Sequence, residues 1–525
     1  MNKKNLFASA ILMLCTLFMF TGCEELISNF DNPVSAYLKV EPSSVIIYRG
    51  ENYQIQYSTI SDAKPIFKSA DETVATVDEN GVITGVMMGT TTISIELPAT
   101  PYYNAASAEF TVEVDGLLKL TALSKEFALN EEYNLGVTTV SDGAITYTSS
   151  DTNVATVDAS GNVKAVGYGD ATINVHIDAT PTFNRTEDVD FAATVRILDN
   201  EQFTAALAAI ADNGEGTLLL GKDATFTFTS NVDFENKKLT ILGEEKNPAI
   251  FNTKGTLKIK RGLTIKNVIV NFTSNGNINF ATVQQLTDPA PKEGGSYFAF
   301  EPIIFENLTF NNLNSCLIKG KEYIVFSDIQ VNNCIIGMRE NCNAGIFNFD
   351  KGYPKNIEVK NSTFWSKGAG HLGYLFNGSG KPGDVSSTAT TTFTVDHCSM
   401  YKIAVNKKAN NGGNIRGKDW TYINLTNSIL VDFGSSVGDE ITGWLFGQNA
   451  SAANKPNRTY LNNSYFTSGG SVVNGWTDSA KGGDASGTSL ASNPNYKDPE
   501  NGDFTPQGAD QIAEKTGDPR WYKTN

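Results

Sequence analysis

The segment Ile357-Glu-Val-Lys-Asn-Ser-Thr-Phe364 decides the fold, because its pattern returns along the C-terminal two-thirds of the chain. Apolar residues alternate with polar ones, a polar residue follows, and an apolar residue stands three positions later. The same order occurs in the segments 263–272, 304–310, 325–331, 393–400, 423–430 and 459–466. The polar residues that mark it are Asn267, Asn307, Asp328, Asn361, His397, Asn427 and Asn463.

The repeated segments are unevenly spaced, which predicts stacked coils with loops of variable length. In a parallel β-helix each strand–turn–strand unit lies on the previous one, and loops between units can lengthen without disturbing the core. Asparagine at the turn can hydrogen-bond its equivalents in neighbouring coils, which satisfies amides that would otherwise be buried without partners. We therefore expect the seven polar residues to form a ladder.

A helix is expected immediately before the coils. Residues 201–211 (EQFTAALAAIA) place Phe203, Ala206, Leu207 and Ile210 on one face. Residues 217–221 follow as a candidate buried strand. Since the terminal units of a solenoid need capping, this helix is predicted to close the N-terminal end of the coil stack.

The repeated segments resemble those of the pectate lyase-like superfamily of right-handed β-helices. The tail supports this likeness, because residues 493–504 (NPNYKDPENGDF) and 517–521 (GDPRW) are similar to the closing segment of such proteins in gut bacteria. The resemblance covers about residues 198–525. It implies a fold and leaves the activity open.

An internal duplication precedes the coils. Residues 69–78 (SADETVATVD) recur as 149–158 (SSDTNVATVD), and the same offset maps 99–101 onto 179–181. Alternating apolar residues with Gly and Asp turns predict small β-sandwiches. The shared motif resembles the bacterial immunoglobulin-like group 2 family, whose modules act mainly as spacers or adhesive domains. The fold class is therefore all-β, with Ig-like sandwiches at 35–115 and 116–197 followed by the β-helix. The pair is expected to form a stalk, with ligand binding as the alternative.

The N-terminus has the layout of an export signal. Lys3 and Lys4 precede an apolar run, and the run closes at residues 20–23 (FTGC). The closing tetrapeptide resembles a bacterial lipobox, which implies removal of residues 1–22, acylation of Cys23 and a lipidated linker over 23–34. Ordinary secretion with a free Cys23 is the alternative. Glu24 and Glu25 resemble surface-export signals of glycan-utilisation lipoproteins in Gram-negative gut bacteria.

Charge and cysteine content exclude some functions. The formal net charge of -16 argues against nucleic acid as a partner, because binding phosphates requires a basic face. The chain has no CxxC pair, so no metal site is predicted. Unpaired core thiols are favoured over disulfides for the four cysteines of the coils, which are Cys316, Cys334, Cys342 and Cys398.

The catalytic motifs of β-helix enzymes are incomplete here. Residues 395–397 (VDH) resemble part of the W-I-D-H motif of pectate lyases, although His397 also falls on the ladder position. Arg416 and Lys402 are the other catalytic candidates, but the family's R-x-P-x-x-R segment has no match. The chain also lacks an adjacent Asp-Asp pair of the galacturonase type. No cofactor is evident, and calcium is expected only if the chain is a lyase.

Binding residues are easier to nominate. Aromatic faces stack on sugar rings, and a basic run can meet an acidic polysaccharide, although aromatic residues also cover coil ends and lysine runs are often solvated. The ligand-binding candidates are Trp365, Trp420, Trp444, Tyr401, Lys407 and Lys408. We expect a glycan-binding lipoprotein that is lipid-anchored to the outer membrane and exposed at the cell surface, with an outer-membrane glycan importer as a partner. A polysaccharide lyase with a divergent site and an adhesin are the alternatives.

The topology prediction can be tested on intact cells. A protein anchored on the outer surface should be degraded when whole cells are treated with a protease, whereas a periplasmic protein should survive until the cells are lysed. Immunoblotting before and after lysis measures this. Full protection in intact cells would contradict the surface-exposed orientation.

Overall fold

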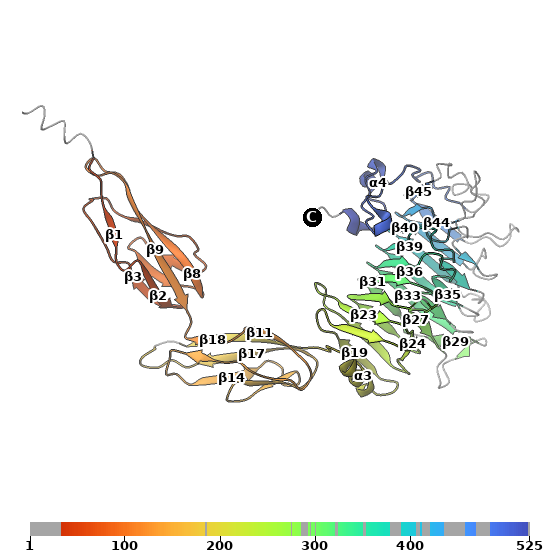
Figure 1. Cartoon of the computed structure of the whole chain (residues 1–525), viewed down its shortest axis with the longest axis horizontal. Helices are drawn as coiled ribbons and strands as arrows, with labels where there is room; N and C mark the ends of the chain where they lie inside the picture. The colour runs from red at the N-terminus through yellow and green to blue at the C-terminus, as the bar shows by residue number, and fades with distance from the viewer. Residues whose placement is uncertain are drawn as a thin grey trace, which may run out of the picture.

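A computed structural model describes the chain from residue 33 onward. The described residues are 33–183, 186–274, 276–284, 292–293, 296–299, 301–320, 324–349, 353–378, 390–405, 410–411, 421–434, 457–468 and 483–522. Two β-sandwiches lead into a stack of parallel coils (Figure 1). This confirms the predicted all-β class and its order of domains. No helix among the described residues has the length and apolar character needed to cross a membrane.

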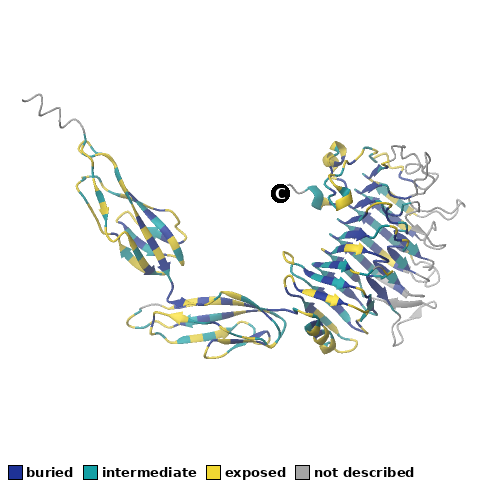
Figure 2. Ribbon diagram, viewed as in Figure 1, coloured by how far each residue is buried: buried dark blue, intermediate teal, exposed yellow. Residues whose placement is uncertain are grey.

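The first sandwich, module 1, pairs a four-stranded sheet (order β2-β9-β8-β5) with a three-stranded sheet (β3-β7-β6) and a β1–β4 ribbon. Residues alternate between buried and exposed along β8 and β9, so one face of each strand enters the core (Figure 2). Its strands are β1 (Leu38–Val40), β2 (Ser44–Tyr48), β3 (Asn52–Gln54), β4 (Tyr57–Thr59), β5 (Ile66–Ser69), β6 (Ala75–Val77), β7 (Val82–Gly85), β8 (Gly89–Leu97) and β9 (Ala106–Asp115).

The second sandwich, module 2, repeats this topology strand for strand, with sheets β11-β18-β17-β14 and β12-β16-β15 and a β10–β13 ribbon. The duplication seen in the sequence is therefore a duplication of structure. Its strands are β10 (Leu118–Lys119), β11 (Ser124–Phe127), β12 (Glu132–Asn134), β13 (Thr138–Thr139), β14 (Ile145–Ser149), β15 (Ala155–Val157), β16 (Asn162–Ala165), β17 (Gly169–Ile177) and β18 (Glu187–Val195).

The predicted N-terminal helix is present as α3 (Asn200–Ala209). Asp199 caps it, because its carboxylate accepts a hydrogen bond of 2.9 Å from the backbone N–H of Gln202. Phe203 and Ala206 are buried, and Phe203 packs edge-on against Phe251 of the coil stack. The helix thus covers apolar side chains that the first coil would otherwise expose.

The coils form three sheets of parallel strands, and each coil contributes one strand to the first sheet and one to the second. Among the described residues, all coils but the last two also contribute a strand to the third sheet. The first sheet holds β19 (Glu215–Leu219), β22 (Lys238–Leu242), β25 (Leu263–Lys266), β30 (Ile303–Glu306), β33 (Ile324–Asn332), β36 (Tyr353–Lys360), β39 (Thr391–Asp396), β42 (Thr421–Thr426) and β44 (Asn457–Leu461), with β28 (Lys292–Glu293) and β29 (Ser296–Ala299) beside it.

The second and third sheets complete each coil, and buried residues from all three sheets fill one continuous core. The second sheet holds β20 (Thr225–Phe228), β23 (Ala249–Thr253), β26 (Val268–Phe272), β31 (Thr309–Leu313), β34 (Ile335–Met338), β37 (Thr363–Ser366), β40 (Ser399–Tyr401), β43 (Ile429–Val431) and β45 (Ser464–Phe466). The third holds β21 (Val232–Asp233), β24 (Leu257–Ile259), β27 (Ala281–Val283), β32 (Ile318–Gly320), β35 (Phe347–Phe349), β38 (Phe376–Gly378) and β41 (Asn410–Asn411).

One residue turns the chain from the first sheet into the second, and it has a left-handed backbone. Asparagine and histidine adopt this conformation more readily than most residues. The residues at this turn position, all with φ between 49° and 58°, are Asn267, Asn307, Asn333, Asn361, His397, Asn427 and Asn462. Five of the seven predicted residues therefore occupy the turn position, and Asp328 and Asn463 were placed wrongly. The side-chain ladder itself is not continuous, because Asn307 donates to Asn267 (3.0 Å) but Asn361 donates to Asn332 (3.3 Å) and Asn427 to Asp396 (3.0 Å).

The two errors have a structural reason. Asp328 lies on β33, where its carboxylate accepts a hydrogen bond of 2.8 Å from Asn356 on the neighbouring strand. That strand continues to Asn332, so the turn falls at Asn333. Asn463 follows the turn residue and is fully buried. The sequence pattern thus identified these two coils but placed their turn positions a few residues away from where they lie.

The position after the turn residue points inward and forms a second row. Five buried residues of this row are Cys334, Ser362, Cys398, Ser428 and Asn463. The Cys334 N–H donates to Ser362 Oγ (3.0 Å), and the Ser428 N–H donates to Asn463 Oδ1 (3.1 Å). Burial raises the pKa of the Cys334 thiol to about 12. All four cysteines of the coils are buried and unpaired, as expected.

His371 joins three successive coils. The side chain is fully buried. Its Nδ1 accepts a hydrogen bond from the Ala404 N–H (3.3 Å), and its Nε2 donates one to the Ala344 carbonyl (2.8 Å). This arrangement requires a neutral ring with the proton on Nε2. Burial lowers the pKa of His371 to about 4.

The stability of the β-helix should therefore depend on pH through His371. The His371 ring takes up a second proton near pH 6.5 in the unfolded chain but only near pH 4 in the folded chain. The neutral ring therefore makes its full contribution to the free energy of unfolding above pH 6.5. As the pH falls from 6.5 to 4, the free energy of unfolding should decrease by roughly 3 kcal/mol. Tryptophan fluorescence in urea measures it, because every tryptophan lies beyond residue 364.

The control variant is His397→Asn, which restores the usual residue at the turn position and should keep the same pH dependence. His371→Gln should remove the pH dependence between 6.5 and 4. If His371→Gln titrates like the wild type, another group is responsible.

Candidate functional site

The C-terminal segment covers one half of the outer face of the second sheet. It consists of η3 (Pro499–Asn501), α4 (Ala509–Glu514) and η4 (Pro519–Tyr522) with their connections (Figure 1). Phe504 is fully buried at its centre, 5.9 Å from the ring of Trp365, 5.9 Å from Tyr401 and 5.7 Å from Trp521. The segment closes this half by aromatic packing.

This packing accounts for two of the predicted ligand-binding residues. Tyr401 is buried, and its hydroxyl donates a 2.7 Å hydrogen bond to Glu500. Trp365 is partly buried in the same cluster. Both aromatic rings support the closing segment, so neither presents a free face for a sugar. The other four candidates, Trp420, Trp444, Lys407 and Lys408, lie outside the described residues.

The two catalytic candidates among the described residues do not converge. His397 is half-exposed at the turn before β40 and pairs with Asp396 at 3.0 Å. Lys402 follows the other end of β40 and pairs with Glu500 at 2.5 Å. Four residues lie between His397 and Lys402, so the two flank opposite ends of β40 and their Cα atoms are roughly 16 Å apart at full extension. Arg416 lies outside the described residues.

The other half of the second sheet is not covered by the closing segment. Its outward side chains on β23, β26, β31 and β34 form two rows, which we call the open face. The first row is Ile250, Ile269, Thr309 and Ile335, which are partly buried and parallel in register. The second row is a polar ladder in which Asn311 donates to Asn271 (2.9 Å) and Asn271 donates to Asn252 (2.9 Å).

The turn residues border the open face on its other side. The side-chain amide of Asn307 donates to Asn267 Oδ1 at 3.0 Å, which leaves Asn307 Oδ1 available to accept a hydrogen bond from a ligand. Asn333 makes no side-chain hydrogen bond within the described part of the chain. A mildly apolar strip thus runs between two rows of amides, one on the sheet and one along the turns.

A groove of about 430 Å³ forms where the open face meets the closing segment. It is lined by Glu245, Asn307, Thr309, Asn333, Asn361, Pro519 and Arg520. Arg520 Nη2 donates to the carbonyls of Asn361 (2.8 Å) and Cys334 (3.3 Å), and Arg520 Nε pairs with Asp518 at 2.7 Å. Burial raises the pKa of the Asp518 carboxyl, and the ion pair with Arg520 opposes that rise.

The chemistry of this groove suits binding better than bond cleavage. Amides, a hydroxyl and a guanidinium offer donors and acceptors for hydroxyl groups, and the isoleucines of the adjoining open face offer apolar contact. Glu245 is the single carboxylate among the lining residues, whereas glycoside hydrolysis uses a pair. The described residues also contain no cluster of three or more His, Cys, Asp or Glu side chains that could hold a metal ion.

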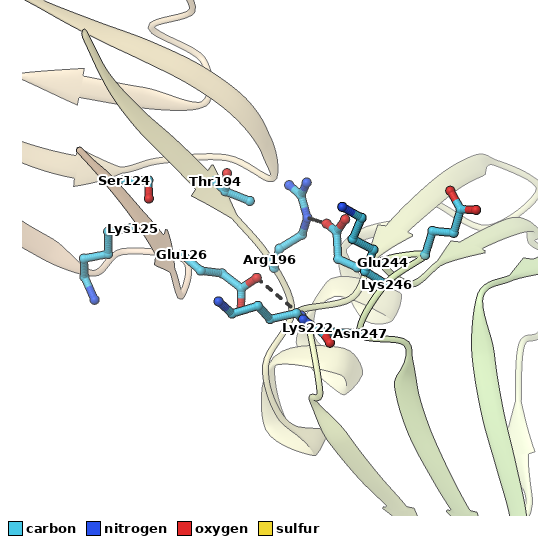
Figure 3. Close-up of a pocket in the computed structure, with 10 residues that line it drawn as sticks. Ser124, Lys125, Glu126, Thr194, Arg196, Lys222, Glu244, Lys246 and Asn247 are labelled. Carbon is cyan, nitrogen blue, oxygen red and sulfur yellow. Dashed lines mark hydrogen bonds and ion pairs between the residues drawn. The ribbon is translucent and has the colours of Figure 1, made fainter. Parts of the chain in front are cut away.

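A second cavity, of about 400 Å³, lies between module 2 and the first coils (Figure 3). Arg196 crosses it with a side chain that is 10% exposed, and it pairs with Asp170 of module 2 (2.9 Å) and with Glu244 of the coils (3.0 Å). The Lys222 N–H donates to Glu126 at 3.3 Å. The Arg196 ion pairs and the Lys222–Glu126 hydrogen bond therefore join two domains across this cavity.

Sequence reasoning missed the open face. Its signal was present as an apolar or Thr residue two positions before Asn in residues 250–252, 269–271 and 309–311. These Asn residues are regularly stacked, but each coil was aligned on its turn residue alone. A search for a second polar position at a fixed distance from the turn would have found the row.

Three family models match the chain. The model described as bacterial Ig-like domain (group 2) matches residues 37–96 and 133–182, which lie in the two modules. The β-helix is matched at 224–367 and 393–521 by two models described as domains of unknown function, DUF4957 and DUF5123. The resemblance of the modules is therefore confirmed, while the matches to the coils name no activity.

Individual relatives cover only parts of the chain. Ice-binding protein 1 of Shewanella frigidimarina is 31% identical over 146 residues, which is 25% of this chain, and the chain spans only 16% of that relative. Among solved structures, domains 4 and 5 of the S-layer protein SbsC match 31% of this chain and 99% of their own, at 16% identity and a TM-score of 0.13.

A further solved structure is a SusE-like surface located polysaccharide binding protein from the heparin utilisation locus of Bacteroides thetaiotaomicron. It is 11% identical, covers 32% of this chain and 35% of its own, and has a TM-score of 0.16. Function must therefore be argued from the β-helix surface.

Arg520 should hold the closing segment in place. Arg520→Met keeps the apolar stem but leaves Asp518, which is 1% exposed, without its cation. We expect a loss of about 3 kcal/mol, because one member of a buried ion pair is removed. Loosening should expose Trp365 and Trp521, which red-shifts their fluorescence. Lys497→Met, which breaks an exposed pair with Asp503, should change stability by less than about 0.5 kcal/mol. Equal losses of stability in Arg520→Met and Lys497→Met would contradict the role of Arg520 in holding the closing segment.

Proposed function

We propose that the protein is a cell-surface lipoprotein that captures a polysaccharide on the open face of its β-helix. The observation that carries this proposal is the pairing of two amide rows with an apolar strip between them. Sugars present hydroxyl groups at their edges and C–H groups on their faces, so they match such a surface. Because parallel coils repeat about every 4.8 Å, the surface is regular along the stack and suits a linear polymer.

The N-terminal half of the chain supports a role at the surface. Cys23 would carry the lipid that anchors the protein to the outer membrane. Two consecutive Ig-like modules would then hold the β-helix away from the bilayer, where a large external polymer can reach it. Capture would supply the polymer for degradation and for uptake by an outer-membrane importer.

The charge on the described part of the groove favours a neutral or weakly charged segment of the glycan. Arg520 is paired with Asp518, and Glu245 is exposed on the opposite rim. The basic residues Lys407, Lys408 and Arg416 lie outside the described residues, and an acidic, pectin-like ligand depends on them. The choice between neutral and acidic glycans is therefore a direct test of which surface binds.

Affinity electrophoresis against pectins, glucans and glycosaminoglycans tests the proposal. At least one polymer should retard the wild type. Thr309→Lys, which places a long side chain across the open face, should weaken binding by about tenfold or more, equivalent to about 1.4 kcal/mol. Thr264→Lys is the matched control, because Thr264 is also a partly buried outward threonine but lies on the first sheet. It should bind within about twofold of the wild type.

Other outcomes discriminate the alternatives. Retardation that Thr309→Lys leaves unchanged would move the site away from the open face. Failure of every glycan to retard the protein would remove the proposal and favour an adhesin that recognises protein. Appearance of an unsaturated, ultraviolet-absorbing product with uronate polymers would identify a lyase instead.

A further inference from the structure

The end of module 1 at which the described chain begins carries an exposed apolar and aromatic patch. Tyr37 is 50% exposed, Ile60 48% and Tyr102 65%. Leu38 pairs with Thr59 in the β1–β4 ribbon, so Tyr37 and Ile60 stand next to each other at its end. Val34 bridges to Tyr103, which brings the Tyr102 loop to the same end. We call Val34, Tyr37, Ile60 and Tyr102 the tyrosine end.

The duplication shows what the corresponding surface does in module 2. The offset of 80 residues maps Tyr37 onto Leu117, which is only 1% exposed. The Leu117 N–H donates to Glu187 at the junction, and the Phe183 ring lies edge-on to Tyr48 of module 1 at 6.4 Å. In module 2 the part of this end around Phe183 thus contacts the preceding domain, while Val140, the equivalent of Ile60, stays exposed. In module 1 the same surface faces outward.

We propose that the tyrosine end docks on the lipid bilayer that holds the Cys23 anchor. This inference rests on the lipid-anchored location proposed above. Only nine residues lie between Cys23 and Pro33, so the chain between them reaches about 35 Å at full extension. The end of module 1 is therefore confined near the membrane surface.

The residue types fit a bilayer interface. Tyrosine has an apolar ring and a polar hydroxyl, and it concentrates where acyl chains meet headgroups. Val34 and Ile60 add aliphatic area between the rings. Lys39 and Glu41 pair with each other at 2.7 Å, and Asp62 is exposed two residues after Ile60, so the patch has no net basic character. Zwitterionic headgroups are accordingly the expected surface.

Two matched labelling sites test the docking. Ile60 and Val140 are equivalent positions in the two modules, and they are 48% and 50% exposed. Each is replaced by cysteine in the full lipidated chain and labelled with an environment-sensitive maleimide fluorophore. The protein is inserted into vesicles of phosphatidylcholine and phosphatidylethanolamine that contain spin-labelled phosphatidylcholine. The native thiols of the coils are buried, so they should remain unlabelled.

Docking predicts that the spin-labelled lipid quenches the fluorophore at Ile60→Cys at least threefold more than the one at Val140→Cys. Adding Tyr37→Ser and Tyr102→Ser should bring the quenching at Ile60→Cys down to the Val140→Cys level, while the protein still floats with the vesicles. Equal quenching at both sites, or quenching that the serine variants leave unchanged, would overturn the proposal and leave this end free for a protein partner.

The anchor and the glycan site are tested separately. Cys23→Ser should stop the protein from floating with the vesicles; a wild-type chain that does not float would remove the anchor on which this inference depends. Retardation by glycans should be the same in the serine variants and in the wild type, so a loss of docking and a loss of glycan binding are distinguishable.

Discussion

The β-helix depends on one backbone constraint, which is the left-handed residue between its first and second sheets. Because this residue turns the chain from one sheet into the next in a single step, consecutive coils keep the same outline. Its N–H also donates to the next coil, as from Asn267 to the Glu306 carbonyl and from Asn361 to the Asp396 carbonyl, both at 3.1 Å. Turn geometry and inter-coil pairing are thus set together, and loops elsewhere in the coil can vary in length.

The same constraint creates the surface on which a ligand would lie. Once the turns are stacked, residues at fixed distances from them must stack as well, whether they point into the core or outward. Cys334 and Ser362 line up inside, and Asn252, Asn271 and Asn311 line up outside. The closing segment then divides the outer face, because Phe504 and Arg520 cover its far half and leave the near half open.

The sequence was sufficient for the architecture and insufficient for the site. Repetition revealed both the modules and the coils, because a shared core imposes the same residue types at each repeat. Repetition could not show whether Asn462 or Asn463 occupies the turn position, since both are asparagines and only the backbone angle distinguishes them. It also presented Trp365 and Tyr401 as binding residues, because the contact that covers them comes from a segment more than 90 residues away.

The junction around Arg196 has a mechanical consequence. Strand β18 enters the first coil directly, through hydrogen bonds from the Ile197 N–H to the Leu219 carbonyl (2.8 Å) and from the Gly221 N–H to the Ile197 carbonyl (2.9 Å). Tension on a polymer held by the coils would pass along β18, which is paired with β17 over its whole length from Glu187 to Val195. Such a force would load many hydrogen bonds in shear at once, so module 2 would resist unravelling under a pull from the coils.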